Sequence, residues 1–372
     1  MRVKLLSVTN GWLYRHRKLV AWSGGTLAVL LVALAASGYL VYRHLSDNIA
    51  QVNLETYIGK QPADLHPRAE NILIIGSGSA RGAAAGAAGA GKRSDTLMLV
   101  HVAGDRQWAE IMSIPPSSRV TIPSCTAAGR RLSASALGAA CTIKALERST
   151  GIYISHFIVM NDSGFKGMVA ALGGVEVRNL TAVDNPGAGL VLAPGRHQLT
   201  PAQALAYAHG SLGPGGSSGQ ARVAVQEALA WSLITRARSN LSDPLATYRF
   251  LDAFTRSLTV DSQLGGITGL YHLAQSLHGM RAGKIALFAL PSYPHAGVVP
   301  SDATDVRWMQ SADSEIFASF RDDVQASPAL LAAVSRLGES GVLAPATPGT
   351  STEILKRTAD QSISVARRAA NV

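Results

Sequence analysis

The sequence ENILIIGS (Glu70–Ser77) opens the stretch from which a central sheet can be predicted. RSDTLMLVHV (Arg93–Val102) and AEIMSIPPSSRVTIP (Ala109–Pro123) follow it. Each of the three holds a short apolar run that meets glycine, proline or charged residues, a pattern typical of buried strands. Similar runs alternate with amphipathic segments as far as about Asp323, so we predict an α/β domain. Ligands of such sheets bind at strand ends, and we expect the functional site there.

The composition indicates a globular domain with an additional apolar part. Of 372 residues, 47% are hydrophobic and 16% are charged, and this length suits one large domain or two small ones. Two cysteines exclude both a disulfide-dense scaffold and a C-x-x-C metal pair. The net charge of +10 favours anionic partners: nucleic acid, anionic lipid or an acidic polymer.

The apolar part is Leu19–Val41, which contains no charged side chain and is long enough for the roughly 30 Å hydrocarbon core of a bilayer. Several basic residues and no acidic residue precede it. Because cationic flanks stay in the cytoplasm, we predict a single-pass anchor with a cytoplasmic N-terminus and an extracellular main domain. Two alternatives remain, a signal peptide cleaved near Ala33-Leu34-Ala35 and a buried core helix.

These features divide the chain into five predicted parts. We expect a cytoplasmic tail at 1–18, a transmembrane anchor at 19–41, a stalk at 42–69, a folded domain at 70–323 and a mostly flexible, basic tail at 324–372. An extracellular domain permits a disulfide between Cys125 and Cys141. The alternative is two separate buried thiols.

Arg93-Ser94-Asp95-Thr96 places charged and hydroxyl groups at one entrance to the predicted sheet. Arginine can hold phosphate oxygens with two parallel hydrogen bonds, and aspartate supplies the hard oxygen that magnesium prefers. The alternative is a capped turn with a surface arginine. The nearby Gly86–Lys92 fits G-x-x-x-x-G-K, but Arg93 stands where a nucleotide-binding loop needs Ser or Thr, so we interpret it as a Gly/Ala loop.

The order and spacing of several segments resemble the LytR-CpsA-Psr (LCP) family, and actinobacterial members in particular. Besides the three segments quoted above, these are TGIYISHFI, GGVEV, APGRHQLTPAQALAYA, R-x-x-x-Q (Arg222–Gln226), SLTVD and LFALP, and together they cover about residues 70–323. The resemblance implies one membrane anchor and an extracellular α/β/α sandwich with a mixed central sheet. It further implies a pocket for a polyprenyl-phosphate or pyrophosphate lipid. Active members transfer a glycopolymer from its lipid carrier onto peptidoglycan, using Mg²⁺, arginines and aspartates.

The resemblance also implies which residues form the site. The catalytic residues would be Arg93, Asp95, Arg119 and Arg222. The lipid phosphate would be bound by Arg81, Arg93, Arg119, Arg222 and Gln226. Asp95 would be the metal ligand.

Four motifs depart from the family pattern. Residues expected to be Asp or Arg are replaced by Gly78 and Ala80, by Pro116 and Ser117, by His209 and Ser211, and by Gly219 and Val225. One remaining carboxylate is a poor magnesium site, although magnesium also accepts water and phosphate oxygens. We therefore expect Mg²⁺ to bind weakly or not at all, and catalysis to be weak or lost. His209 could be a substitute ligand or base; the alternative is a solvated loop residue.

Two functions follow from these observations. One is a phosphotransferase that attaches an anionic glycopolymer to peptidoglycan. The other is a non-catalytic protein that binds a polyprenyl lipid or wall polymer and modulates an active paralogue. Direct binding of nucleic acid is excluded if the domain lies outside the cell.

Overall fold

The protein is described by a computed structural model. It covers residues 17–53, 58–77, 94–115, 118, 138–179, 182–186, 189–209, 225–226, 228–230, 232–233, 236, 243–278, 280, 284–294, 306–308 and 310–339. The chain separates into two compact units, Met1–Asn48 and Ile49–Val372.

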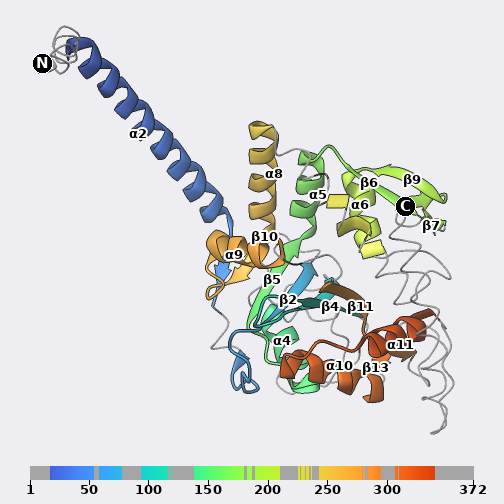
Figure 1. Ribbon diagram of the computed structural model, residues 1–372. Coiled ribbons are helices and arrows are strands. Elements are labelled where there is room, and N and C mark those ends of the chain that lie inside the picture. The colour runs from blue at the N-terminus through green and yellow to red at the C-terminus, as the bar shows by residue number, and fades with distance from the viewer. Residues whose placement is uncertain are drawn as a thin grey trace, which may run out of the picture. The chain divides into compact units, whose positions relative to one another are not determined.

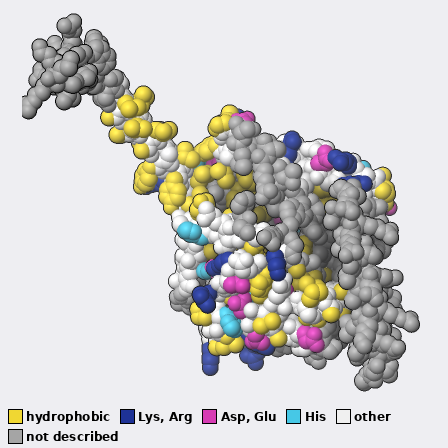
Figure 2. Space-filling model, in the orientation of Figure 1, with side chains coloured by type: hydrophobic (Ala, Val, Ile, Leu, Met, Phe, Trp, Pro, Cys, Tyr) yellow, Lys and Arg dark blue, Asp and Glu magenta, His cyan; other side chains and the backbone are white. Residues whose placement is uncertain are grey.

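The N-terminal unit contains the long helix α2 (Arg17–Asn48). Its part from Thr26 to Asn48 is long and apolar enough to cross a membrane. The large hydrophobic side chains from Leu27 to Tyr42 are exposed, and Figure 2 shows them along the helix. The predicted apolar N-terminal helix is thus confirmed, while its orientation and the absence of cleavage stay predictions.

The second unit is built on a mixed seven-stranded sheet in the order β1-β10-β5-β2-β3-β4-β11 (Figure 1). The strands are β1 (Ala50–Val52), β2 (Glu70–Ser77), β3 (Ser94–Val102), β4 (Ala109–Ile114), β5 (His156–Asn161), β10 (Leu258–Asp261) and β11 (Ile285–Ala289). The pairs β2–β5, β4–β11 and β1–β10 are parallel, and the pairs β2–β3, β3–β4 and β5–β10 are antiparallel. The predicted α/β class with a mixed central sheet is confirmed.

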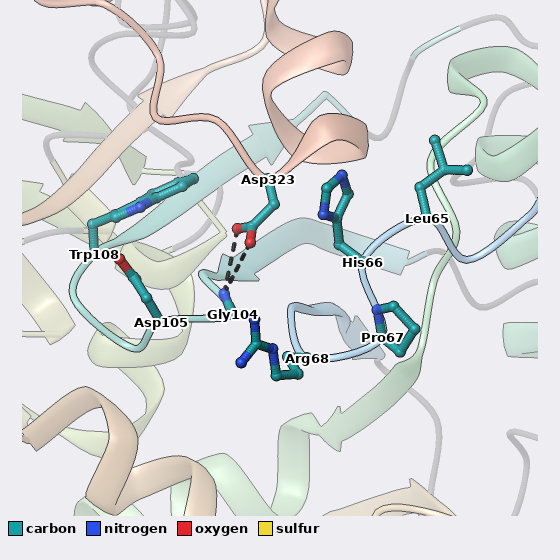
Figure 3. A pocket seen from close by; sticks show the side chains of 8 residues that line it. All are labelled: Leu65, His66, Pro67, Arg68, Gly104, Asp105, Trp108 and Asp323. Carbon is teal, nitrogen blue, oxygen red and sulfur yellow. Dashed lines mark hydrogen bonds between the residues drawn. The ribbon is translucent and has the colours of Figure 1, made fainter.

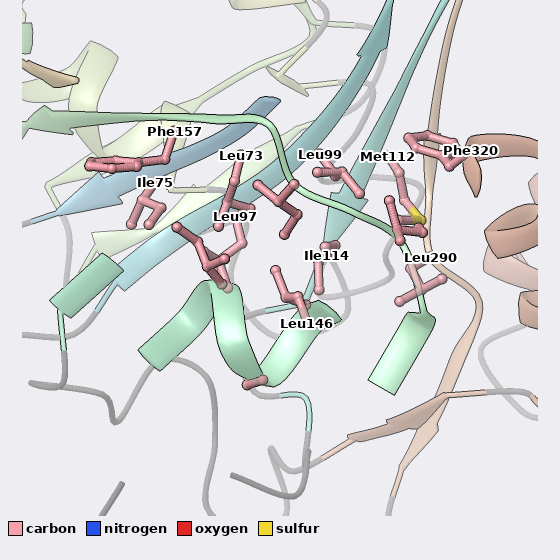
Figure 4. Packing of buried hydrophobic residues seen from close by; sticks show 14 of the residues in the cluster. Leu73, Ile75, Leu97, Leu99, Met112, Ile114, Leu146, Phe157, Leu290 and Phe320 are labelled. Carbon is pink, nitrogen blue, oxygen red and sulfur yellow. The ribbon is translucent and has the colours of Figure 1, made fainter. Parts of the chain in front are cut away.

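Both faces of the sheet are apolar. The central strands carry continuous apolar runs, and successive side chains of a strand point to opposite faces. On one face Leu73, Ile75 and Leu99 pack with helices α4 (Gly138–Thr150) and α10 (Gln310–Asp322), as Figure 4 shows for part of this core. On the other face Ile72 and Val100 pack against α9 (Gly266–His278). Helices therefore cover the sheet on both sides, which gives the expected α/β/α sandwich.

A second apolar cluster forms beside the sheet. It packs helices α5 (Asp162–Ala171), α6 (Pro201–Ala208) and α8 (Pro244–Ser257) with the two-stranded sheets β6 (Val175–Asn179)–β9 (Gly195–Leu199) and β7 (Val183–Asn185)–β8 (Leu190–Leu192). Thr200 and Gln203 cap α6 reciprocally, and Asp243 caps α8 by accepting hydrogen bonds from the backbone N–H groups of Leu245 and Ala246. Both caps are followed directly by proline, so the two helix starts are marked by local sequence.

Two further strands and a helix complete the described chain. Strand β12 (Ser292–Pro294) pairs with β13 (Val306–Trp308), and the helix is α11 (Pro328–Glu339). Strand β1 lies within 42–69, where the sequence suggests a stalk, and α11 lies within the expected tail at 324–372. The predicted domain boundaries themselves stay predictions.

Candidate functional site

The three stretches that predicted the sheet meet at one of its edges. The carboxyl ends of β2, β4, β5 and β11 lie there together with the amino ends of β3 and β10, because Ser77 pairs with both Ser94 and Asn161, and Leu97 pairs with Ile114. We call this the site edge. The other ends of the same strands, at Asn71, His101, Glu110, His156 and Asp261, form what we call the opposite edge.

A β-bulge interrupts the ladder at the site edge. The pairing of β2 with β3 passes from Gly76↔Thr96 to Ser77↔Ser94, so Asp95 is left without a partner in the register. Bulges occur next to active sites, where the extra residue re-aims a side chain. The bulge therefore singles out the one aspartate that the family resemblance assigned to the metal, although the side chain of Asp95 is outside the described part.

Most of the predicted site residues cannot be placed. Arg81, Arg93, Arg119 and Arg222 lie outside the described residues, and their roles stay predictions. Cys141, in the first turn of α4, is disulfide-bonded, while Cys125, the other cysteine of the chain, lies outside the described residues.

Gln226 is the predicted phosphate-binding residue that the structure does describe. Its side chain is buried, and Oε1 accepts a hydrogen bond from Ser113 Oγ at 3.1 Å. Ser113 precedes the last residue of β4, so Gln226 lies against this strand close to the site edge. The neighbouring Val225 and Leu229 pack into the second apolar cluster, which ties that cluster to the sheet.

The structure also brings together a pair that the sequence reading did not combine. His209 Nε2 lies 3.5 Å from Asp162 Oδ1, and both side chains are mostly buried but accessible to solvent, at 20% and 25% exposure. Asp162 follows β5 directly and begins α5, while His209 is the C-cap of α6. Asn161 fixes this corner by accepting from Gly164 N at 2.7 Å and donating to Ser257 O at 3.1 Å.

The sequence predicts a role for His209, which stands where the family pattern has an arginine, but it does not predict one for Asp162. A carboxylate placed directly after a buried strand, at the edge shared with Asp95, was the available signal. A histidine beside a carboxylate can accept or hold a proton, and the carboxylate can orient the ring. Among the described residues no group of three or more His, Cys, Asp or Glu is placed to hold a metal ion.

The opposite edge carries polar groups of a different kind, and Figure 3 shows the cavity there with Gly104, Trp108 and Asp323 among its lining residues. His101 is fully buried; Nδ1 lies 2.8 Å from Asn71 Oδ1 and Nε2 lies 3.1 Å from Asp323 Oδ1. The ring of Trp108 packs against the His101 ring in a tilted arrangement, with the two ring centroids 4.9 Å apart. Burial lowers the pKa of His101 below 6.5 and outweighs the opposing effect of Asp323. A cavity of about 360 Å³ lies here, between the turn at Gly104 and the segment that precedes β2.

Two more buried carboxylates belong to this edge. Glu110 accepts from Ala326 N at 2.8 Å, and burial raises its pKa above 4.5. Asp261 accepts hydrogen bonds from His156, Phe157 N and Leu264 N. Although burial raises the pKa of Asp261, these bonds outweigh that effect and hold the pKa below 3.8.

The geometry defines a class of protein: a three-layer α/β domain with polar groups gathered at one sheet edge, joined to an apolar N-terminal helix. Residues 43–321, about three quarters of the chain, match the model of the LytR_cpsA_psr family. The chain belongs to this family.

Similar proteins with curated names support the same assignment. The probable cell wall biosynthesis protein LcpB of Corynebacterium glutamicum is 26% identical over 68% of this chain and 61% of its own length. The polyisoprenyl-teichoic acid–peptidoglycan teichoic acid transferase TagU of Bacillus anthracis is 27% identical over 51% of this chain and 62% of its own length. The chain thus spans about three fifths of the length of these curated relatives.

Solved structures share the fold. An LytR-Csp2A-Psr enzyme from Actinomyces oris aligns with a TM-score of 0.55 at 22% identity, covering 73% of this chain and 95% of that chain. TagT bound to LI-WTA aligns with a TM-score of 0.52 at 18% identity, covering 74% of this chain and 99% of that chain. At these identities the likeness shows the fold alone.

Proposed function

We propose that this protein is an actinobacterial-type LCP protein of the cell envelope, anchored by α2 with its N-terminus in the cytoplasm. It binds a polyprenyl-phosphate- or pyrophosphate-linked anionic glycopolymer and acts in the attachment of that polymer to peptidoglycan. The observation that carries the proposal is the site edge, where β2, β3 and β4 bring the bulge at Asp95 to the carboxyl end of β2. Family membership supplies the reaction class, and the name of TagU describes transfer of this kind.

The chemistry suits such an edge. Phosphoryl transfer depends on positioning and on neutralising the charge of the phosphate oxygens. We assign that charge neutralisation to Arg93, Arg119 and Arg222, with Arg81 and Gln226 in support. With the pyrophosphate-linked polymer, the acceptor hydroxyl of peptidoglycan loses its proton to a base as its oxygen attacks the phosphorus that carries the polymer. The bond from that phosphorus to the bridging oxygen breaks, and polyprenyl phosphate leaves. Asp95 and the Asp162–His209 pair are the groups that we assign to this proton.

The lipid tail requires an apolar environment, and the second apolar cluster supplies one beside the site. It is formed by packed side chains that include those of α5, α6 and α8, and Gln226 and Ser113 connect it to the site edge. Apolar clefts with a few polar groups at one end are the usual form of sites for such ligands. We therefore assign the polyprenyl chain to this cluster and its phosphate to the site edge.

We further propose that transfer is weak or lost and that Mg²⁺ binds weakly or not at all. Gly78, Ala80, Pro116 and Ser117 cannot replace the charged groups of the family pattern, and each missing arginine removes a charge-assisted contact. Asp162 adds a carboxylate to the site edge, but it already faces His209. Magnesium, when bound, would neutralise phosphate charge at Asp95.

The test uses the full chain in lipid nanodiscs, because β1 belongs to the sheet and a fragment starting at Glu70 would lack it. We expect saturable binding of undecaprenyl phosphate and little magnesium-dependent release of polyprenyl phosphate from a lipid-linked glycopolymer. Gly78→Asp should strengthen Mg²⁺ binding, which calorimetry measures directly. Gly86→Asp, in the same Gly/Ala-rich segment, is the control for an added charge.

Three outcomes separate the alternatives. No lipid binding would contradict both the transferase and the binding protein. Rapid turnover that disappears in Asp95→Ala would show a fully active transferase instead of a weakened one. Lipid binding without turnover, even after Gly78→Asp, would favour the second candidate, a non-catalytic protein that modulates an active paralogue.

A further inference from the structure

Helix α8 presents apolar side chains to solvent along one side. Leu245 is 56% exposed, and Tyr248 and Leu251 are each 36% exposed. Their spacing of three residues places them along one stripe of the helix. Figure 2 shows hydrophobic side chains on the surface where α8 lies in Figure 1.

The opposite side of α8 packs against the rest of the domain. Phe250 and Phe254 pack against the second apolar cluster. A Cβ at Gly164 of α5 would overlap Ser257 Cβ, so the two helices approach as closely as glycine permits. This packing fixes the rotation of α8, and the stripe of Leu245, Tyr248 and Leu251 therefore stays on the outside.

α8 also stands at a defined place in the fold. It ends at Ser257, and β10 begins at the next residue, Leu258, at the site edge. Its fourteen residues span about 21 Å at 1.5 Å per residue, and Figure 1 shows the helix beside α5 beyond that edge. The amino-terminal half of α8, which carries Leu245 and Tyr248, is thus its part farthest from the sheet.

The chain from the apolar helix enters the domain at the same edge. β1 runs parallel to β10, with Ala50 opposite Thr259, so its first residue lies at the site edge. Only Ile49 separates the start of β1 from the end of α2 in the sequence.

We propose that the stripe of Leu245, Tyr248 and Leu251 on α8 is a membrane-binding surface that rests on the bilayer to which α2 anchors the protein. A tyrosine ring suits the headgroup level, and leucine side chains suit the boundary with the acyl chains. Arg249, also exposed on α8, can contact lipid phosphates, whereas Asp252 and Arg256 pair with each other at 3.0 Å.

The inference rests on the proposed membrane anchoring and is independent of the proposed transfer reaction. Its test places a nitroxide spin label at Leu245→Cys or Tyr248→Cys in the full chain, reconstituted in phosphatidylcholine–phosphatidylglycerol vesicles. Cys141 is disulfide-bonded and does not compete for the label. Leu65→Cys is the matched control, because Leu65 is 55% exposed and lines the cavity at the opposite edge.

Collisions with oxygen, which concentrates in lipid, are compared with collisions with a water-soluble nickel chelate. We expect the oxygen-to-nickel ratio at residues 245 and 248 to exceed that at residue 65 several-fold, and Arg249→Gln to reduce the difference. Equal ratios at the three positions would overturn the inference. Exclusion of both reagents at residue 245 would also overturn it, because protein and not lipid would then cover the face. Neither result would alter lipid binding or turnover in the experiment on the proposed function.

Discussion

Polar side chains at the two edges of the seven-stranded sheet differ in burial and in hydrogen bonding. At the opposite edge, His101, Glu110 and Asp261 are buried and each is held by two or more hydrogen-bond partners. At the site edge, the described pair Asp162–His209 is partly exposed and meets at 3.5 Å. The first arrangement stabilises the fold, since a buried polar group contributes only when it is fully bonded. The second leaves water and ligands access to the charges.

This comparison predicts that substitutions at the opposite edge change the stability of the fold, while substitutions at the site edge change ligand binding.

The largest effect on stability is expected at His101. His101→Ala removes a fully buried ring that contacts Trp108 and Phe320 and leaves Asp323 without its imidazole partner. The free energy of unfolding should fall by about 3 kcal/mol, as for other buried aromatic side chains.

Chemical denaturation of the full chain in detergent, followed by circular dichroism, measures this loss. Exposed His272 on α9 provides the control, and His272→Ala should change stability by less than about 0.5 kcal/mol. A loss at His101 no larger than at His272 would show that the opposite edge does not stabilise the fold.

A loss of about 2 kcal/mol is expected for Asp261→Asn, because three hydrogen bonds to a charged acceptor become weaker. The effect should also depend on pH. The pKa of Asp261 in the folded state lies below its ordinary value of 3.8, so its stabilising contribution is complete above that value and is lost as the pH falls through the folded pKa.

Thermal unfolding between neutral pH and strongly acidic pH tests this dependence. The variant should lose less stability than the parent protein as the acid is added. Parallel pH profiles for the two proteins would mean that the hydrogen bonds of Asp261 do not depend on its charge.

At the site edge the informative change is His209→Arg, which restores the arginine of the family pattern. The affinity for undecaprenyl phosphate should rise about tenfold, the equivalent of about 1.4 kcal/mol, because a charge-assisted contact is added. Stability should change by less than about 0.5 kcal/mol, since the present pair is partly exposed.

Calorimetric titration with the lipid and a thermal melt together decide this prediction. His272→Arg, at an exposed histidine of α9, is the control for an added positive charge. A large change in stability with no change in affinity would mean that His209 stabilises the fold and does not bind the ligand. The two edges would then not differ in function.

The smallest effect is expected at Glu110, and its sign is opposite to that of Asp261. Burial raises the pKa of Glu110 above 4.5, so the folded state retains this proton when the unfolded chain has lost it. Stability therefore falls as the pH rises from 4.5 through the raised pKa of the folded state. Glu110→Gln should remove this decline, which urea denaturation at a series of pH values can detect. A steeper decline in the variant would contradict the assignment.

Much of the sheet could be predicted because the signals are local. Apolar runs bounded by glycine and proline predict β2, β3 and β4, and the N-cap residues Thr200 and Asp243, each followed by proline, are local signals for two helix starts. β1 could not be predicted, because three residues in a polar stretch become a strand only through pairing with β10. The bulge at Asp95 depends on a register between strands, which no local pattern specifies.

The candidate site shows the same limit. His209 attracted attention as a departure from a family pattern, but its contact with Asp162 joins the end of α6 to the start of α5. The bond between Ser113 and Gln226 likewise joins a strand to a distant helical segment. Such contacts arise from tertiary packing, so the sequence could name the chemical groups but not their partners.

The place of β1 in the sheet has a consequence for the order of events during synthesis. Strands β2, β3 and β4 are neighbours along the chain and can pair as soon as they are made, whereas Ala50 must wait for Thr259. Contacts between segments so far apart in the chain form late, because the loop between them must close first. The strand joined to α2 is therefore among the last to dock. Until then the backbone groups of β1 lack their sheet partners and are open to pairing with other chains, and a chain whose synthesis stops before β10 cannot complete this side of the sheet.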